Sequence, residues 1–224
     1  MKSSTCLTLL LSALLAGGNL FARQDKVSLV NPIIGTNGMG HTFPGACVPF
    51  GLVQLSPDTD TIPHNVDGKY QPRSYEYCAG YQHKDSSIVG FSHTHFSGTG
   101  HSDLGDILIM PTTGSLKLNP GTATHPDGGY RSRFSHDTEI SRPGYYEVML
   151  ADYGVKAQLT TTKRVGVHKY TFPQDSKNQR IILDMIHGIY NYDGKVLWTN
   201  IRVENDTLVT GYRITNGWAR TNYT

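Results

Sequence analysis

The segment from Gly90 to Asp103, GFSHTHFSGTGHSD, concentrates side chains that can do chemistry. It contains three histidines among serine, threonine and glycine residues. Imidazoles titrate near neutral pH, hydroxyls donate and accept hydrogen bonds, and glycine adopts backbone conformations closed to other residues. A strand built only for packing would instead place Val, Ile or Leu at alternate positions. The composition therefore indicates a segment that lines a site.

The histidines of this segment have two interpretations. On a strand, His93 and His95 would share one face, about 7 Å apart. Together with His101, Asp103 and Asp106 they have the ligand types that zinc or iron prefers. The alternative is a buried hydrogen-bonded network that holds the glycine-rich loops together. We favour the network over a metal site, and we keep both histidines as candidates for lining a substrate pocket.

The elements that must position these residues are predicted to be strands. Residues 31–85 are rich in Gly and Pro and predict short strands with long ordered loops. No segment shows sustained helical periodicity, so the pattern favours an all-β, antiparallel β-sandwich. Strands are expected over Phe50–Leu55, Ile107–Met110, Tyr145–Leu150, Val155–Thr162, Val165–Phe172 and Arg180–Ile186, and as a hairpin over Val196–Glu204 and Thr207–Ile214.

The beginning of the chain and its charge suggest an exported protein. Lys2, the apolar stretch Cys6–Ala16 and a small residue at Ala22 predict a signal peptide over residues 1–22. The apolar stretch is too short to span a membrane, so we expect a secreted or periplasmic protein without a membrane anchor. The formal net charge is +2 and no Lys/Arg stripe is present, which argues against a nucleic-acid partner.

Cleavage of the signal peptide would leave Cys47 and Cys78. In an oxidising compartment they could form one disulfide. Two unpaired, buried thiols are the other possibility, and the sequence leaves both open.

Several long motifs, in order along the chain, carry a family resemblance. GFSHTHFSGTGHSDLGD (residues 90–106) is preceded by two other glycine-containing stretches. Together they closely resemble the N-terminal domain of glycoside hydrolase family 92, whose members are bacterial exo-acting α-mannosidases. The matching segments are NPIIGTNGMGHTFPGA (31–46), VPFGLVQLSPD (48–58), YEYCAGY (75–81), FSHDTE (134–139), PGYYEV (143–148), TTKRVGVHKYTFP (161–173) and TGYRITNGWARTNY (210–223).

This resemblance implies a β-sandwich of the mutarotase-like (supersandwich) type, followed by an (α/α)-barrel domain, with the substrate pocket between them. It also implies calcium dependence and inversion, which requires two carboxyl groups about 6.5–9.5 Å apart. In the family, both carboxyl groups and most calcium ligands belong to the C-terminal domain. We therefore expect no catalytic residue within this chain.

The chain ends at Thr224 without a turn signal. We expect residues 23–224 to be an incomplete N-terminal sandwich that lacks its last strands and the catalytic barrel, and to be inactive alone. The expected partners are mannose-containing glycans and the chain's own C-terminal domain.

The segment Tyr75–Cys78 falls where family members place a residue that touches the sugar beyond the cleaved bond. An aromatic ring offers a flat apolar face to a sugar, and a carboxylate accepts hydrogen bonds from its hydroxyls. We therefore predict that Tyr75, Glu76 and Tyr77, with Cys78 beside them, contribute to substrate binding. The alternative is tyrosines packed at the sandwich edge with a solvated Glu76.

Two other functions remain open from the sequence. One is a stand-alone carbohydrate-binding sandwich. The other, which we favour less, is a metal-dependent hydrolase that uses His93, His95 and His101.

Overall fold

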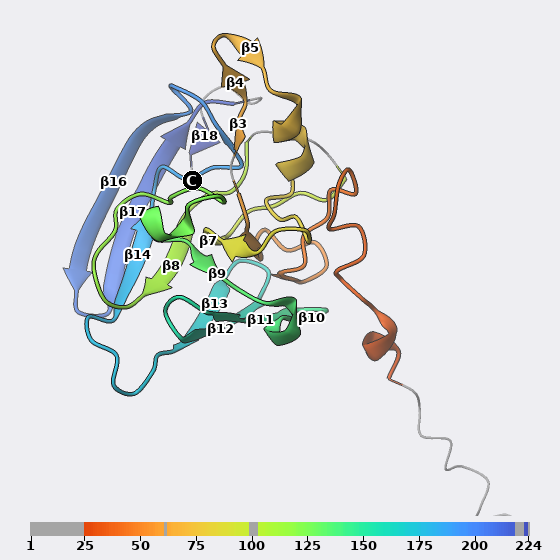
Figure 1. Ribbon diagram of the computed structural model, residues 1–224, viewed down its shortest axis with the longest axis vertical. Helices are drawn as coiled ribbons and strands as arrows, with labels where there is room; N and C mark the ends of the chain where they lie inside the picture. Colours follow the sequence, from red (N-terminus) through yellow and green to blue (C-terminus); the bar gives the residue numbers. More distant parts are fainter. Residues whose placement is uncertain (1–24, 61, 99–102, 218–221, 224) are drawn as a thin grey trace, which may run out of the picture. The chain divides into compact units, whose positions relative to one another are not determined.

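The computed structural model describes residues 25–60, 62–98, 103–217 and 222–223 of the chain. The described residues fall into two units, one made of residues 25–30 and the other beginning at residue 31 (Figure 1). The described part of the first unit contains one 3₁₀ helix, η1 (Lys26–Leu29), which Asp25 caps by accepting a hydrogen bond from the Val27 amide. The predicted signal peptide, residues 1–22, lies outside the described residues. In the described part, none of the helices is long and apolar enough to cross a membrane.

Two antiparallel sheets form the centre of the second unit. The five-stranded sheet has the order β1-β2-β7-β8-β14, and the four-stranded sheet has the order β10-β11-β12-β13. Their strands are β1 (Ala46–Cys47), β2 (Gln54–Asp58), β7 (Gly90–Ser92), β8 (Leu108–Thr112), β14 (Arg180–Asp184), β10 (Ile140–Arg142), β11 (Tyr145–Leu150), β12 (Val155–Thr161) and β13 (Gly166–Thr171).

Shorter pairings and 3₁₀ helices surround these sheets. β15 pairs with β3 in parallel, and β4–β5 and β6–β9 are antiparallel pairs, as is the three-stranded sheet β16-β17-β18. The remaining elements are β3 (Ile62–Pro63), β4 (Asn65–Val66), β5 (Lys69–Tyr70), β6 (Ser87–Ile88), β9 (Ser132–Arg133), β15 (Tyr190–Asn191), β16 (Val196–Asn205), β17 (Leu208–Thr215), β18 (Asn222–Tyr223), η2 (Pro72–Tyr77), η3 (Pro126–Gly128) and η4 (His136–Thr138).

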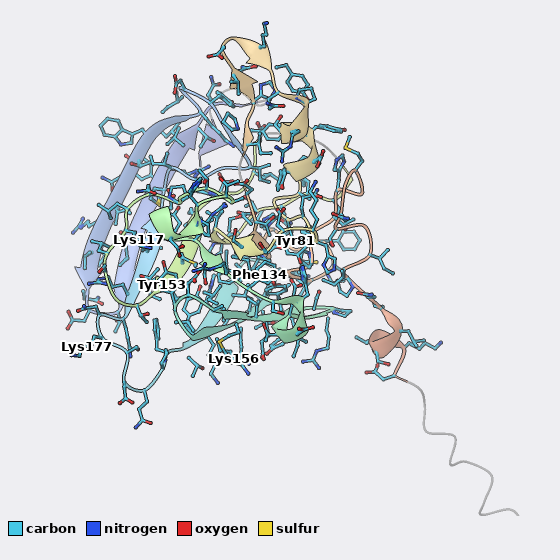
Figure 2. All side chains as sticks on the ribbon, viewed as in Figure 1. Tyr81, Lys117, Phe134, Tyr153, Lys156 and Lys177 are labelled. Atoms are coloured by element: carbon cyan, nitrogen blue, oxygen red, sulfur yellow. The ribbon has the colours of Figure 1, made fainter. Side chains whose placement is uncertain are left out.

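One hydrophobic core joins the two main sheets. Alternate residues of β11 and β12 point inward, as expected for strands with one buried face. They pack with buried residues of β2, β7 and β8. Tyr81 and Phe134, both labelled in Figure 2, extend this core beyond the strands, while Lys177 lies exposed at the periphery. The contributing side chains include Leu55, Phe91, Leu108, Met110, Tyr146, Val148, Leu150, Val155, Ala157 and Leu159.

The strand predictions are accurate in the second half of the chain and less so in the first. β11 has the predicted bounds, and the hairpin β16–β17 forms as expected. The predicted strand Phe50–Leu55 is wrong: β2 covers Gln54–Asp58 and includes Pro57. A proline fits there because β1 pairs with Gln54 and Leu55 only, which leaves one side of residues 56–58 without a ladder partner in that sheet.

Candidate functional site

Three glycine-containing segments that are far apart in the sequence meet in space. We call residues 36–45, 75–82 and 92–98 the loop cluster. The Gln82 amide clamps the first two segments: its oxygen accepts from the Gly38 amide at 2.7 Å, and its nitrogen donates to the carbonyls of Gly38 (2.9 Å) and Glu76. The Gly98 amide donates to the His41 carbonyl at 2.7 Å. The motifs that stood out in the sequence therefore form one connected surface.

The predicted segment Tyr75–Cys78 lies on η2 and at its end. Tyr75 and Glu76 are half-buried, whereas Tyr77 and Cys78 are buried. The Tyr75 ring meets the His41 ring edge-on, with centroids 4.7 Å apart. Tyr75 and Glu76 are therefore the members of this segment that offer surface to a ligand.

Glu76 is held as a carboxylate. The Lys84 ammonium lies 2.5 Å from Glu76 Oε2, and its hydrogen bond lowers the pKa of Glu76. Tyr77 donates a hydrogen bond to Asp85 at 3.1 Å, and burial raises the pKa of its hydroxyl. The buried side chain of Tyr77 therefore anchors η2 to Asp85, while the side chain of Glu76 stays partly exposed to solvent.

Cys47 and Cys78 are both free thiols. Cys78 is buried against Ile189 and Tyr190, and burial raises its pKa to about 11. Cys47 is exposed on β1. The disulfide does not form in this structure, and the alternative of two buried thiols is right for Cys78 only.

His95 belongs to a buried polar group beneath the loop cluster. Its Nε2 lies 2.8 Å from Asp58 Oδ1, and its Nδ1 donates to the Gln54 carbonyl at 2.7 Å. On the other side of Asp58, His187 Nε2 lies 2.7 Å from Oδ2. Burial opposes the charge on Asp58, but the charges and hydrogen bonds of the two histidines outweigh it and lower its pKa. Asp58 is thus an anion held between the side chains of His95 and His187.

His93 links the two main sheets through a relay of neutral rings. Its Nδ1 donates to the Ile107 carbonyl at 2.8 Å, which leaves its Nε2 to accept from His168 Nε2 at 3.1 Å. His168 Nδ1 then accepts from the Tyr170 hydroxyl at 2.7 Å. Burial, followed by the charge that His93 would carry, lowers the pKa of His168 to about 3. Each hydrogen bond in this network has one donor and one acceptor when both rings are neutral.

His93 and His95 do not lie on a strand, because β7 ends at Ser92, so the condition for a shared face is not met. The His93 ring contacts the Ile107 carbonyl and the His95 ring contacts Asp58. Asp106 forms a buried ion pair with Arg213 at 2.6 Å. In the described part of the chain, the side chains of His93, His95 and Asp106 do not form a group with metal-ligand spacing. His101 lies outside the described residues.

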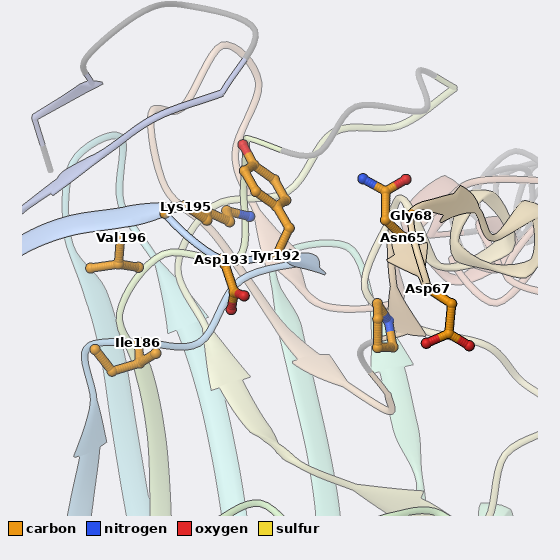
Figure 3. Close-up of a pocket in the computed structure, with 10 residues that line it drawn as sticks. Asn65, Asp67, Gly68, Ile186, Tyr192, Asp193, Lys195 and Val196 are labelled. Atoms are coloured by element: carbon orange, nitrogen blue, oxygen red, sulfur yellow. The ribbon is translucent and has the colours of Figure 1, made fainter.

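A pocket of about 860 Å³ opens near Tyr192. Figure 3 shows Tyr192, Asp193 and Lys195 on one side, with Asn65 and Asp67 across from them. Tyr192 also packs against the small core of Cys78, Ile189 and Tyr190. Because Cys78 directly follows η2, the pocket borders the core next to this helix. Its lining of hydroxyl, carboxylate, amide and ammonium groups suits a polar ligand.

Sequence reasoning missed Asp58, His187, His168 and Lys195. The predicted strand ends at Leu55, three residues before Asp58. His187 lies 129 positions from its partner Asp58, so a local sequence pattern cannot connect the two. Lys195 is buried beside the pocket, and burial together with the charge of Arg213 lowers its pKa to about 8. A lysine in the apparent turn Asp193-Gly194-Lys195 gave no sign of burial.

The carboxylates near the loop cluster do not fit a complete calcium site. Calcium takes six to eight oxygen ligands. Here Asp58 faces two histidines, Asp106 faces Arg213, and Glu76 faces Lys84. These nitrogen partners occupy the positions that a cation would need.

Known proteins share this sequence and fold. Residues 29–224 match the glycosyl hydrolase family 92 N-terminal domain. A family 92 α-mannosidase from Bacteroides thetaiotaomicron, solved with mannoimidazole, is 45% identical with a TM-score of 0.79, over 88% of this chain and 24% of that one. A family 92 inverting mannosidase from the same organism is 27% identical with a TM-score of 0.61, over 88% of this chain and 24% of its own.

A secreted glycosidase of uncharacterised function from Arthroderma benhamiae is 29% identical over 161 residues, 68% of this chain and 18% of that protein. The chain thus spans about a quarter or less of the length of these relatives. The predicted sandwich and the predicted family are both confirmed. Because the family match extends over residues 29–224, this chain belongs to glycosyl hydrolase family 92, as its N-terminal domain.

Proposed function

We propose that this domain is part of a secreted or periplasmic exo-α-mannosidase that removes mannose from glycans with inversion. The similarity to a family 92 α-mannosidase, 45% identity at a TM-score of 0.79, is the observation that carries this proposal. An inverting relative and a secreted relative support the stereochemistry and the location.

In this proposal the loop cluster forms one side of the substrate pocket. Glu76 is half-buried and anionic, so it is suited to accept hydrogen bonds from sugar hydroxyls. Tyr75 is supported from behind by His41 and offers part of its ring to the sugar. The buried group around Asp58 and the relay through His93 keep these loops in a fixed position, so the surface is ordered before substrate arrives.

The catalytic acid and base are proposed to lie in the domain that follows. An inverting glycosidase protonates the leaving oxygen with one carboxyl group and activates water with another. Asp58, Asp106 and Glu76 are already bound by histidine, arginine or lysine, and none of them is assigned either role. The proposal includes calcium, with ligands mainly outside this domain.

The test is an assay of the full-length protein on α-linked mannobioses, followed by proton NMR. Release of mannose as the β-anomer first, lost with a chelator and restored by calcium, is the expected result. Release of the α-anomer first, or no mannose from any α-linked disaccharide, would refute the proposal. Activity that survives the chelator would remove calcium from it.

A further inference from the structure

A second cluster of metal-ligating side chains lies outside the loop cluster. His83, His136 and Glu139 each direct one ligand atom to a common region, and these atoms all lie within 4.8 Å of one another. The rings of His83 and His136 are 4.0 Å apart between centroids, at an angle of 35°. The three residues come from two segments of the chain more than 50 positions apart in sequence.

Local structure explains why these side chains meet. His136 begins η4 and Glu139 caps its end, a spacing of three residues that puts both side chains on one side of a 3₁₀ turn. Ser135 fixes the start of this turn by accepting from the Asp137 amide. His83 is held by its backbone amide, which donates to the Thr36 carbonyl at 2.8 Å.

Glu139 is a buried carboxylate whose charge needs a counter-charge. Its side chain is 3% exposed. It accepts hydrogen bonds from the hydroxyls of Tyr81 (2.9 and 3.0 Å) and Tyr146 (2.6 Å), and His136 Nδ1 lies 2.7 Å away. Burial and the charge of Glu139 raise the pKa of both tyrosines, so they remain neutral donors. The neutral tyrosines satisfy oxygen lone pairs but leave the negative charge buried, which favours a cation beside it; a protonated His136 supplies one, and a metal ion bound by a neutral His136 supplies another.

The donor set selects the kind of cation. Two imidazoles and one carboxylate suit zinc, which binds His nitrogen at about 2.0–2.1 Å and carboxylate oxygen at about 2.0–2.2 Å. Calcium and magnesium prefer oxygen ligands only. Tetrahedral zinc would bring the ligand atoms to roughly 3.3 Å from one another, so the widest pair must close by at most about 1.5 Å. His83 is half-buried in a loop, and a change of its side-chain torsions can supply this movement.

We propose that His83, His136 and Glu139 bind one zinc ion. Tyr81 and Tyr146 orient the carboxylate as outer partners, the arrangement that commonly surrounds metal ligands. His136, whose side chain is 38% exposed, leaves the site open to solvent, so water completes the coordination. The ion fastens the segment after Tyr81 to the turn that precedes β10. This binding does not depend on the proposed glycosidase activity.

The test is a zinc titration of the full-length protein, freed of transition metals by a chelator and then kept in excess calcium. Calorimetry should show one zinc per chain, and cobalt substituted for zinc should give the visible absorption of a low-coordinate site with nitrogen and oxygen ligands. His83→Ala should weaken zinc binding by at least about 100-fold, since the loss of a ligand exceeds the 10- to 100-fold effect of an outer partner. Tyr81→Phe should weaken it by about tenfold.

His125→Ala is the matched control, because His125 is exposed and lies outside the cluster. It should bind zinc as the wild type does. Because His83 is only half-buried, His83→Ala should keep the metal-free melting temperature of the wild type, and zinc should raise that temperature in the wild type alone. Zinc binding that is absent in the wild type, or equally strong in His83→Ala, would overturn the proposal.

Discussion

At the scale of single residues, polar groups buried between strands hold the loop cluster in place. His168 shows how such a group depends on its protonation state. The neutral ring accepts from Tyr170 and donates to His93, whereas a protonated ring has no lone pair for Tyr170. The lowered pKa of His168, about 3, reflects burial and the charge that His93 would carry.

Acid should therefore weaken the fold through His168. Its folded-state pKa lies below the unfolded value of about 6.5, so its stabilising contribution is complete above pH 6.5 and is lost as the pH falls toward the folded value. Between pH 7.5 and 5.5 this residue should account for a loss of about 1 kcal/mol in the free energy of unfolding. His168→Gln keeps an amide donor but does not titrate, so its free energy of unfolding should fall less between pH 7.5 and 5.5.

Urea denaturation of the full-length protein at the two pH values measures this difference in the free energy of unfolding. His125→Gln, at an exposed histidine, is the control and should match the wild type. An equal pH dependence of the free energy of unfolding in His168→Gln and the wild type would show that protonation of His168 does not affect stability in this range.

At the scale of elements, the loops pack by close backbone approach as well as by side chains. Gly80 has φ +79°, and a Cβ at this position would lie 2.0 Å from Asp58 Oδ1 and 3.0 Å from His95 Nε2. Gly68, in the turn between β4 and β5, has a similar φ of +73° but open space around it. The two glycines share a backbone conformation and differ in what surrounds them.

Gly80→Ala should destabilise the domain far more than Gly68→Ala. The left-handed conformation alone costs about 1–2 kcal/mol for alanine. At Gly80 the added methyl also displaces a buried, paired carboxylate, so the total should reach about 3 kcal/mol or more. Thermal unfolding of both variants gives the comparison. Equal losses of stability in the two variants would mean that Asp58 can move aside to make room for the added methyl group.

The same contrast explains what the sequence predicts and what it does not. Tyr145–Leu150 is rich in aromatic and apolar residues and follows the turn residue Gly144, so the strand and its bounds are predictable, while the alternating burial along it is seen only in the structure. Residues 31–85 carry no comparable strand pattern, because their structure depends on glycine conformations and distant contacts such as the Gln82 clamp. The prediction that histidines and glycine loops form a network is correct, but its centre, Asp58 with His187, joins positions too distant for local patterns to connect.

At the scale of the whole molecule, the hairpin β16–β17 presents an unusual amount of apolar surface. Trp198 is 59% exposed and Val203 is 71% exposed, and further apolar residues along both strands are exposed as well. Long exposed apolar strands promote association between chains.

Residues 23–224 expressed alone should therefore aggregate, and the double substitution Trp198→Lys and Val203→Lys should reduce this aggregation. Light scattering measures the effect, and a soluble wild-type monomer with a cooperative melt would argue against it.

The central claim is that the loop cluster of this domain contacts the glycan in a mannosidase pocket. The most direct measurement is kcat/KM of the full-length protein on a set of α-linked mannobioses, compared between the wild type, Glu76→Ala and the exposed control Lys177→Ala. Loss of a hydrogen bond to a charged group should change the ratio between linkages on the order of tenfold in Glu76→Ala, and Lys177→Ala should leave it unchanged. A small, uniform loss across all linkages, or no activity of the wild type on any of them, would contradict the account.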